Sequence, residues 1–360
     1  MHYADYLRLH ELLDLQRRES ERQGSPAHDE MLFIIIHQAY ELWFKQILFE
    51  LDLVQEIFSG PVVEDTDTGK IVHALDRVLA IQKLLVQQVD ILETMTPMDF
   101  LEFRDLLMPA SGFQSVQFRE LEIRLGLERD ERLSVDGGAF DVRLKPEERE
   151  YLARIEKRPS LLGQLDRWLA RTPFVDMKDF DFERAYTSAL HDMLAAEHAL
   201  IESNEYLTTE ERERQLASLD RARNMLDALF DEARYRELQE RGAWRLSRPA
   251  LKAALFIHLY RDEPALQLPF RMLSLLMDID EAMSTWRLRH ALMAQRMIGR
   301  KVGTGGSSGH GYLRETADRH RVFEDLFSIA TFLIPRSSLP RLPEGVHKAM
   351  SYRYASTAGR

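Results

Sequence analysis

The chain has 360 residues, of which 45% are hydrophobic and 30% charged, with 17 glycines and 13 prolines. This composition is typical of a folded globular protein and excludes a disordered or fibrous one. The net charge of -11 repels phosphate backbones and anionic lipid, so we expect neither nucleic acid nor a membrane as a partner. The absence of cysteine excludes disulfides, cysteine nucleophiles and thiolate ligands, so any metal must be held by histidine or oxygen ligands.

The sequence contains no segment typical of membrane insertion or export. The longest apolar run, Met31 to Ile36, stops at His37 and is far shorter than the roughly 18 residues of a membrane helix. The N-terminal region carries Asp5 and Glu11 and has no uninterrupted apolar stretch like that of a signal peptide. We therefore expect a cytoplasmic protein.

Apolar residues recur at helical spacing along nearly the whole chain, without alternating strand patterns, which predicts an all-α fold. The first long helix is expected over residues 26–60, with Glu41 and Lys45 on the face opposite its apolar stripe. That stripe consists of Phe33, His37, Tyr40, Phe44, Ile47, Leu51 and Val54. A second helix is expected over residues 71–92. The Thr96-Pro97 pair then caps a third, which carries Phe100 and Arg104 one turn apart.

Further helices are expected at 113–125, which Gly126 ends, and at 146–157 and 160–171. The charged stretch 176–241 indicates a projecting helical hairpin with a solvated face. Apolar density returns after Ser247 and forms a long central helix that ends at Gly299. A glycine-rich stretch, KVGTGGSSGHG, and a last helix over about 312–333 follow. We predict one domain over residues 1–360, with the hairpin as its subdomain.

The twelve histidines are the first candidates for chemistry in a cysteine-free chain. None belongs to an HExxH pattern, and no EF-hand loop is present. His191 and His198 lie in the charged hairpin and are most simply surface residues. His37 and His290 instead lie in apolar stripes, where a hydrogen-bonded core residue and a ligand are both open interpretations.

Two other features have alternative interpretations from the residues alone. Arg104 lies on an otherwise apolar helix, where it forms either a structural ion pair or a bidentate clamp for a carboxylate ligand. The glycine-rich stretch is a flexible loop or a cradle for a carboxylate or propionate, with Thr304, Ser307 and Ser308 as hydroxyl donors. Phe33 and the other aromatic residues on the helices would ordinarily be core.

Four segments taken together resemble one family, the tryptophan 2,3-dioxygenases. They are HDEMLFIIIHQAYELWFKQILFELD at 28–52, MTPMDFLEFRDLLMPASGFQSVQFRELE at 95–122, RDEPALQLPFRMLSLLMDIDEAMSTWRLRH at 261–290, and KVGTGGSSG with the following YLR. The resemblance stays in register from Tyr3 to the SIATFLIPR segment. It implies a helical haem-binding bundle with one haem b per subunit, ferrous when active. It also implies a homotetramer, a dimer of dimers.

The resemblance implies that both atoms of O2 are inserted across the indole C2–C3 bond of L-tryptophan. The product is N-formylkynurenine, the first intermediate of tryptophan catabolism through the kynurenine pathway. His290 would be the axial ligand of the iron, which suits imidazole in a chain without thiolates. His37 would lie near the indole N–H, and Arg104 would clamp the substrate carboxylate.

The same resemblance assigns the remaining site positions. Phe33 and Phe100 would wall the indole, and Thr304 would meet the substrate ammonium group and a haem propionate. The residues lining the haem pocket would be Ser111, Arg119 and Trp286. Two residues would reach into the neighbouring subunit's site and complete it: Tyr3 and Tyr6.

Some positions depart from the family pattern. Ala4 replaces a glycine, Leu288 and Arg289 precede the axial histidine, and His310 and Gly311 follow the glycine-rich motif. Two alternatives remain beside the dioxygenase: a related haem oxygenase acting on another aromatic amino acid, and a haem protein that only senses or carries O2. The carrier would have no use for a carboxylate clamp.

Overall fold

The computed structural model describes residues 1–129, 132, 144–177, 180–299, 314–317 and 319–351. The chain divides into two compact units. Unit 1 comprises Met1–Gly60, His73–Leu161 and Asp278–Val322. Unit 2 comprises Pro61–Val72, Leu162–Met277 and Phe323–Arg360. The single domain over residues 1–360 stays a prediction.

The regular secondary structure of the described chain is almost entirely helical, which confirms the predicted all-α class. Its only described strands, β1 (Asp176–Met177) and β2 (Phe180–Asp181), form one short antiparallel pair. None of the described helices has both the length and the apolar character of a membrane span. The helices that build unit 1 are α1 (Tyr3–Tyr6), α2 (Leu9–Leu12), α3 (Glu19–Arg22), α4 (Glu30–Ser59), most of α5 (Asp65–Leu92), α6 (Pro97–Leu101), η1 (Arg104–Leu107), η2 (Gly112–Gln114), α7 (Val116–Leu125), α8 (Pro146–Ile155) and the second half of α14 (Pro264–Ile298).

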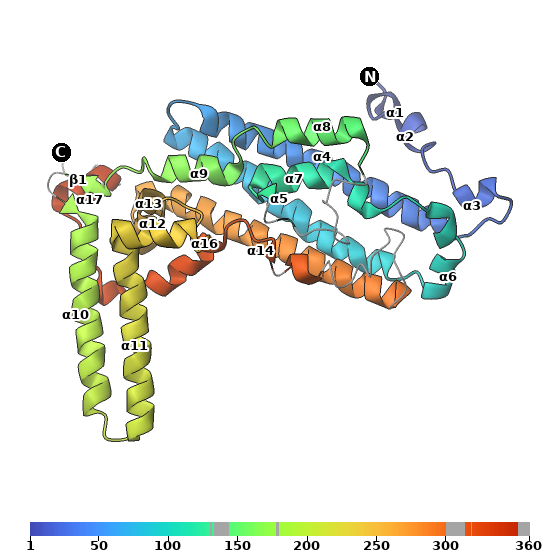
Figure 1. The fold of residues 1–360 in the computed structure, drawn as a ribbon. Helices are drawn as coiled ribbons and strands as arrows, with labels where there is room; N and C mark the ends of the chain where they lie inside the picture. The colour runs from blue at the N-terminus through green and yellow to red at the C-terminus, as the bar shows by residue number, and fades with distance from the viewer. Residues whose placement is uncertain (130–131, 133–143, 178–179, 300–313, 318, 352–360) are drawn as a thin grey trace, which may run out of the picture. The chain divides into compact units, whose positions relative to one another are not determined.

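Unit 2 contains the charged stretch of residues 176–241. Its α10 and α11 run side by side as a pair of long helices (Figure 1). Asp181 caps the first of them, and Thr208 caps the second through a capping box with Glu211. The elements of this unit are α9 (Leu161–Leu169), α10 (Phe182–Ser203), α11 (Thr209–Phe230), α12 (Glu232–Glu240), α13 (Arg248–Leu259), the first part of α14, α16 (Glu324–Ser328), η4 (Ile329–Phe332), η5 (Arg336–Ser338) and α17 (Glu344–Met350).

The first long helix begins later than the sequence predicts, at Glu30 and not at residue 26. The Glu30 carboxylate accepts hydrogen bonds from the backbone N–H groups of Glu19 and Ser20, at 2.8 and 2.9 Å. The Ser20 hydroxyl in turn accepts from the N–H of Ala27. These bonds stabilise a non-helical approach to α4, so the Ser25-Pro26 pair does not start the helix.

The prediction of a single last helix over 312–333 is wrong. The described chain leaves helical structure at His320 and re-enters it at α16, and η4 follows. The carbonyl of His320 accepts from Arg287 Nη1 at 2.9 Å, and the N–H of Val322 donates to Asp280 Oδ1 at 3.0 Å. Backbone groups that a continuous helix would pair internally therefore bond to side chains of α14.

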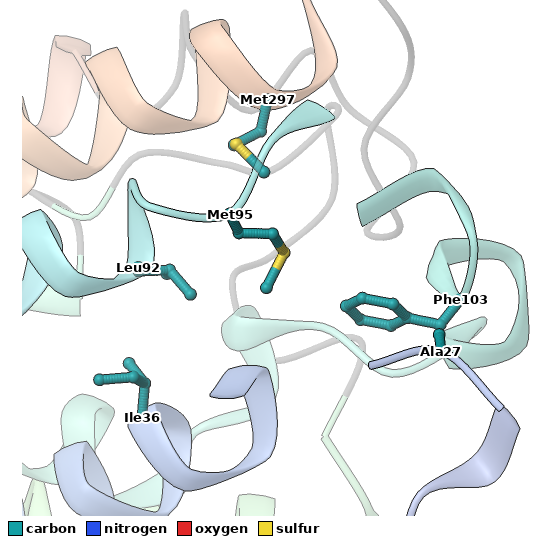
Figure 2. Packing of buried hydrophobic residues seen from close by; sticks show 6 residues of the cluster. All are labelled: Ala27, Ile36, Leu92, Met95, Phe103 and Met297. Atoms are coloured by element: carbon teal, nitrogen blue, oxygen red, sulfur yellow. The ribbon is translucent and has the colours of Figure 1, made fainter. Parts of the chain in front are cut away.

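A cluster of buried apolar side chains holds α4, α5 and α14 together inside unit 1 (Figure 2). Met95 and Met297 lie close to one another in this cluster, and Phe103 packs beyond them. Phe33 and Phe100 are partly buried and pack against it. The cluster therefore forms the base on which the aromatic residues predicted for the site are arranged. Its buried members are Ala27, Ile36, Leu92, Met95, Phe103 and Met297.

Candidate active site

Unit 1 contains a cavity of about 290 Å³, near the lower end of the size of small-molecule sites. Side chains from α4, α5, α7 and α14 line it, together with the segment from α6 to η2. The cavity brings together most of the predicted site residues: Phe33, His37, Phe100, Arg104, Ser111, Arg119, Trp286 and His290. Thr304 lies outside the described residues, and Tyr3 and Tyr6 are exposed on α1, away from this lining.

His290 lies on α14 where that helix passes the cavity. Burial disfavours the charged imidazolium and, with His37 nearby, lowers the pKa of His290 to about 4. Its Nδ1 is buried and has no hydrogen-bond partner among the described residues. The Trp286 ring lies one turn earlier, with its centroid 5.4 Å from that of the imidazole. His290 is therefore neutral near pH 7, the form in which imidazole binds a metal ion.

His37 lies on α4 and lines the same cavity. Its Nδ1 is 2.7 Å from the carbonyl oxygen of Phe33, which can only accept, so Nδ1 carries the proton and donates. The surrounding protein desolvates the ring and lowers the pKa of His37. The neutral ring therefore keeps Nε2 as a hydrogen-bond acceptor.

Arg104 does not share a helix with Phe100, contrary to the sequence prediction. The Thr96 capping box with Asp99 is present, but α6 ends at Leu101 and Arg104 begins η1. Both side chains nevertheless line the cavity. The side chain of Arg104 is only 14% exposed. Asp105 approaches it at 3.9 Å but is 86% exposed, so this contact is a loose one.

Aromatic rings form one apolar wall of the cavity. The Phe33 ring lies 4.1 Å from that of His37 and 5.9 Å from that of Phe100, centroid to centroid. Phe103 packs edge-on behind both phenylalanines, at 5.5 and 5.4 Å. An apolar wall with an imidazole acceptor at one side and a guanidinium on the cavity lining suits a flat aromatic ligand that carries a carboxylate.

The sequence of the whole chain is similar to those of known enzymes. A family model described as tryptophan 2,3-dioxygenase matches residues 1–333. The chain belongs to this family. It is 48% identical to the tryptophan 2,3-dioxygenase of Bdellovibrio bacteriovorus, over 98% of this chain and 99% of that protein. The tryptophan 2,3-dioxygenases of Alteromonas mediterranea and Dictyostelium discoideum are each 46% identical, over 98% and 99% of this chain and 97% and 89% of their own lengths.

The tryptophan 2,3-dioxygenases are haem enzymes, and the cavity residues fit that cofactor. Haem needs one strong axial ligand from the protein and an apolar pocket for its ring. His290 is a neutral imidazole in the cavity wall, the Trp286 ring lies beside it, and Phe118 and Phe44 pack against Trp286. Among the described residues, no group of three or more His, Asp or Glu side chains forms an alternative metal site.

Two residues that the sequence places in the haem pocket have structural contacts as well. The Ser111 hydroxyl accepts from the N–H of Phe113 at 3.4 Å and caps η2. The guanidinium of Arg119 is 5% exposed and donates to Glu122 Oε2 at 2.8 Å. Both side chains reach the cavity, so these contacts fix the direction of polar groups on its lining.

The sequence does not reveal the two acidic residues on the lining of this cavity, Glu41 and Glu122. Glu41 was predicted on the face of α4 opposite the apolar stripe, but α7 packs there, and Gln117 Nε2 donates to Glu41 Oε2 at 2.7 Å. Glu41 and Glu122 both line the cavity. Burial alone would raise the pKa of Glu122, but Arg119, His320 and Arg287 outweigh it and hold that pKa well below its usual range.

Proposed function

We propose that this chain catalyses the insertion of O2 across the indole C2–C3 bond of L-tryptophan, giving N-formylkynurenine, the first step of tryptophan catabolism through the kynurenine pathway. The observation that carries the proposal is the cavity itself. His290 and His37, both with lowered pKa, share it with Arg104 in a chain of the tryptophan 2,3-dioxygenase family. One haem b per subunit would be the cofactor.

His290 would hold the haem iron, and Ser111, Arg119 and Trp286 would line the haem pocket. When bound and ferrous, the haem supplies the site at which O2 is bound and activated. Lowering the pKa of His290 to about 4 keeps the ligand deprotonated at neutral pH, so no proton competes with iron for it. Thr304 is proposed to meet a propionate and the substrate ammonium group.

The substrate would be held by groups that match its parts. Phe33 and Phe100 would wall the indole on one side, and the Arg104 guanidinium would bind the carboxylate through two parallel hydrogen bonds. Nε2 of His37 would accept a hydrogen bond from the indole N–H. Because that N–H is a very weak acid, the role of His37 is to orient the ring for oxygen attack and not to remove the proton beforehand.

We also propose that the active form is a cytoplasmic homotetramer, a dimer of dimers, in which the N-terminal residues complete a neighbour's site. Tyr3 and Tyr6 each have 71% of their surface exposed on α1, where their rings contribute nothing to the core. Large aromatic side chains left this open are suited to packing against another protein surface. Deleting residues 1–7 would test this by lowering both activity and the mass measured in solution.

The test is to incubate ferrous, haem-loaded protein with L-tryptophan in air and follow the absorbance of N-formylkynurenine. The His290→Ala variant should lose stoichiometric haem or its normal ferrous-CO spectrum, while its far-ultraviolet circular dichroism stays that of the parent. Product formation by the parent and loss of haem by the variant are expected. A parent that binds haem but leaves L-tryptophan unchanged would overturn the proposal.

A further inference from the structure

Arg287 lies three residues before His290 on α14, and its side chain is 4% exposed. Its guanidinium donates in two directions. Nη2 bonds to Glu122 Oε1 on α7 at 2.8 Å, and Nη1 bonds to the backbone carbonyl of His320 at 2.9 Å. A single side chain thus ties α14 both to α7 and to the segment that follows α14 in unit 1.

Glu122 is the centre of this connection. Its Oε2 accepts from Arg119 Nη1 at 2.8 Å, and His320 Nδ1 lies 3.6 Å from its Oε1. The side chains of Glu122, Arg119 and His320 are 2%, 5% and 1% exposed. Buried charges of this kind are stable only in a tightly defined arrangement, because a displaced partner leaves a charge without compensation. The cluster therefore has one geometry and resists small shifts of α14.

His290, which would hold the haem iron, has no such anchor. Metal-binding histidines usually donate their second ring nitrogen to a carboxylate or carbonyl, which fixes the ring orientation. Nδ1 of His290 has no hydrogen-bond partner among the described residues. The ring's position then depends on the packing of Trp286 and on where the backbone of α14 is held.

We propose that Arg287 is a positioning residue for the axial histidine: by fixing α14 to Glu122 and to the carbonyl of His320, it sets the approach of the His290 imidazole to the haem iron. This inference rests on the proposed function, in which His290 binds that iron. Arg287 also lines the cavity, but its guanidinium is bonded to Glu122 and to the carbonyl of His320, so its proposed effect on His290 passes through α14. The planar guanidinium of Arg287 donates to two partners at once. A lysine ammonium on its flexible stem does not reproduce this geometry.

The same helix offers a matched control in Arg289, which lies two residues further along. Its Nη2 bonds to Asp90 Oδ1 at 2.6 Å and to Glu93 Oε2 at 3.2 Å, so it also ties α14 to a neighbour, α5. Arg289 is 34% exposed, and Asp90 is 64% exposed. Solvent and side-chain freedom weaken such a pair, so its loss should leave the helix where it is.

The experiment compares Arg287→Lys with Arg289→Lys in haem-loaded full-length protein. The two measurements are the rate of haem transfer to excess apomyoglobin and the iron–histidine stretching band in the resonance Raman spectrum of the ferrous protein. We expect Arg287→Lys to lose haem about tenfold faster and to show a shifted or broadened band, in line with the usual cost of disturbing a ligand's support. Arg289→Lys should match the parent in both.

An unchanged rate and band in folded Arg287→Lys would overturn the inference, as would equal effects of the two variants. Arg287→Gln provides a second test, because it leaves Glu122 paired with Arg119. If neither Arg287 variant folds while Arg289→Lys does, Arg287 serves the stability of the fold and the positioning role is refuted. The proposed function fails separately, when His290→Ala keeps the parent's haem and band. If His290→Ala loses haem as expected, the Arg287 variants test only the inference about Arg287.

Discussion

Charged side chains gather in two regions of the described chain, around Glu122 in unit 1 and along helices α10 to α12 in unit 2. Around Glu122, the carboxylate and two guanidiniums are at most 5% exposed and bond to one another. In the second region, the ion pairs of Arg236 with Glu232 and of Arg241 with Glu237 have between 59% and 74% of their side chains exposed. Both regions contain carboxylates paired with basic side chains. Only in the first does the stability of the fold depend on every partner being present, because no water can replace a lost one.

The largest effect should come from removing the central carboxylate. Glu122→Gln keeps the size of the side chain but leaves Arg119 and Arg287 without their shared counter-charge in a buried site. We expect the free energy of unfolding to fall by about 3–5 kcal/mol, the usual cost of breaking a buried ion pair. Urea denaturation of the parent and variant measures this. A loss no larger than that of Glu232→Gln on α12 would contradict the role of burial.

Arg104 provides a third case for this comparison, because it is a guanidinium on the cavity lining and its proposed ligand is the substrate carboxylate. Arg104→Lys keeps the charge but loses the planar pair of donors, so KM for L-tryptophan should rise roughly tenfold or more. The unfolding transition should stay close to that of the parent, unlike that of Glu122→Gln. Steady-state kinetics and urea denaturation together separate the two roles. An unchanged KM would return Arg104 to a structural ion pair.

Helical periodicity predicted most of the fold, because long amphipathic helices depend mainly on the spacing of their own apolar residues. The end of α7 at Gly126 and the end of α14 at Gly299 were both predicted correctly, and the two glycines have φ of 131° and 59°. The start of α4 and the break at His320 were not. In both places a side chain outside the local pattern binds a backbone group that this pattern assigns to a helix: the Ser20 hydroxyl accepts from the N–H of Ala27, and Arg287 donates to the carbonyl of His320.

The site residues divide in the same way. His37 and His290 stood out because a histidine in an apolar stripe is a local signal, and the structure places both on one cavity. Glu41 was predicted on the face of α4 opposite the apolar stripe, and nothing local reveals that α7 packs over that face. Arg287 had a weak signal, a charge within the apolar part of α14, but its partners lie 165 and 33 residues away in sequence. Only the folded chain reveals that connection.

A smaller effect is expected from a buried histidine outside the cavity. His258 is 7% exposed, donates from Nδ1 to the carbonyl of Ala254 at 2.8 Å, and has its pKa lowered by burial. The imidazole of His258 binds a proton more readily in the unfolded chain than in the folded one. The neutral, buried ring therefore contributes its full stabilisation above the unfolded pKa of about 6.5, and this contribution declines as the pH falls towards the folded pKa. His258→Gln should therefore flatten the fall in thermal midpoint between about pH 7.5 and 5.5. His198→Gln on α10 should leave it unchanged, and a steep fall in both variants would rule out His258 as the cause.

The smallest effect should come from the exposed pair of Arg236 with Glu232, four residues apart on α12 and 2.9 Å from nitrogen to oxygen. Their side chains are 67% and 74% exposed, so water screens the attraction, and holding two long side chains together costs conformational freedom. Arg236→Gln should leave the urea midpoint unchanged within error at both low and high salt. A shift approaching that of Glu122→Gln would mean that the exposed charges of α10 to α12 stabilise the fold as the buried ones do. Exposure to water would then not explain how much an ion pair stabilises this protein.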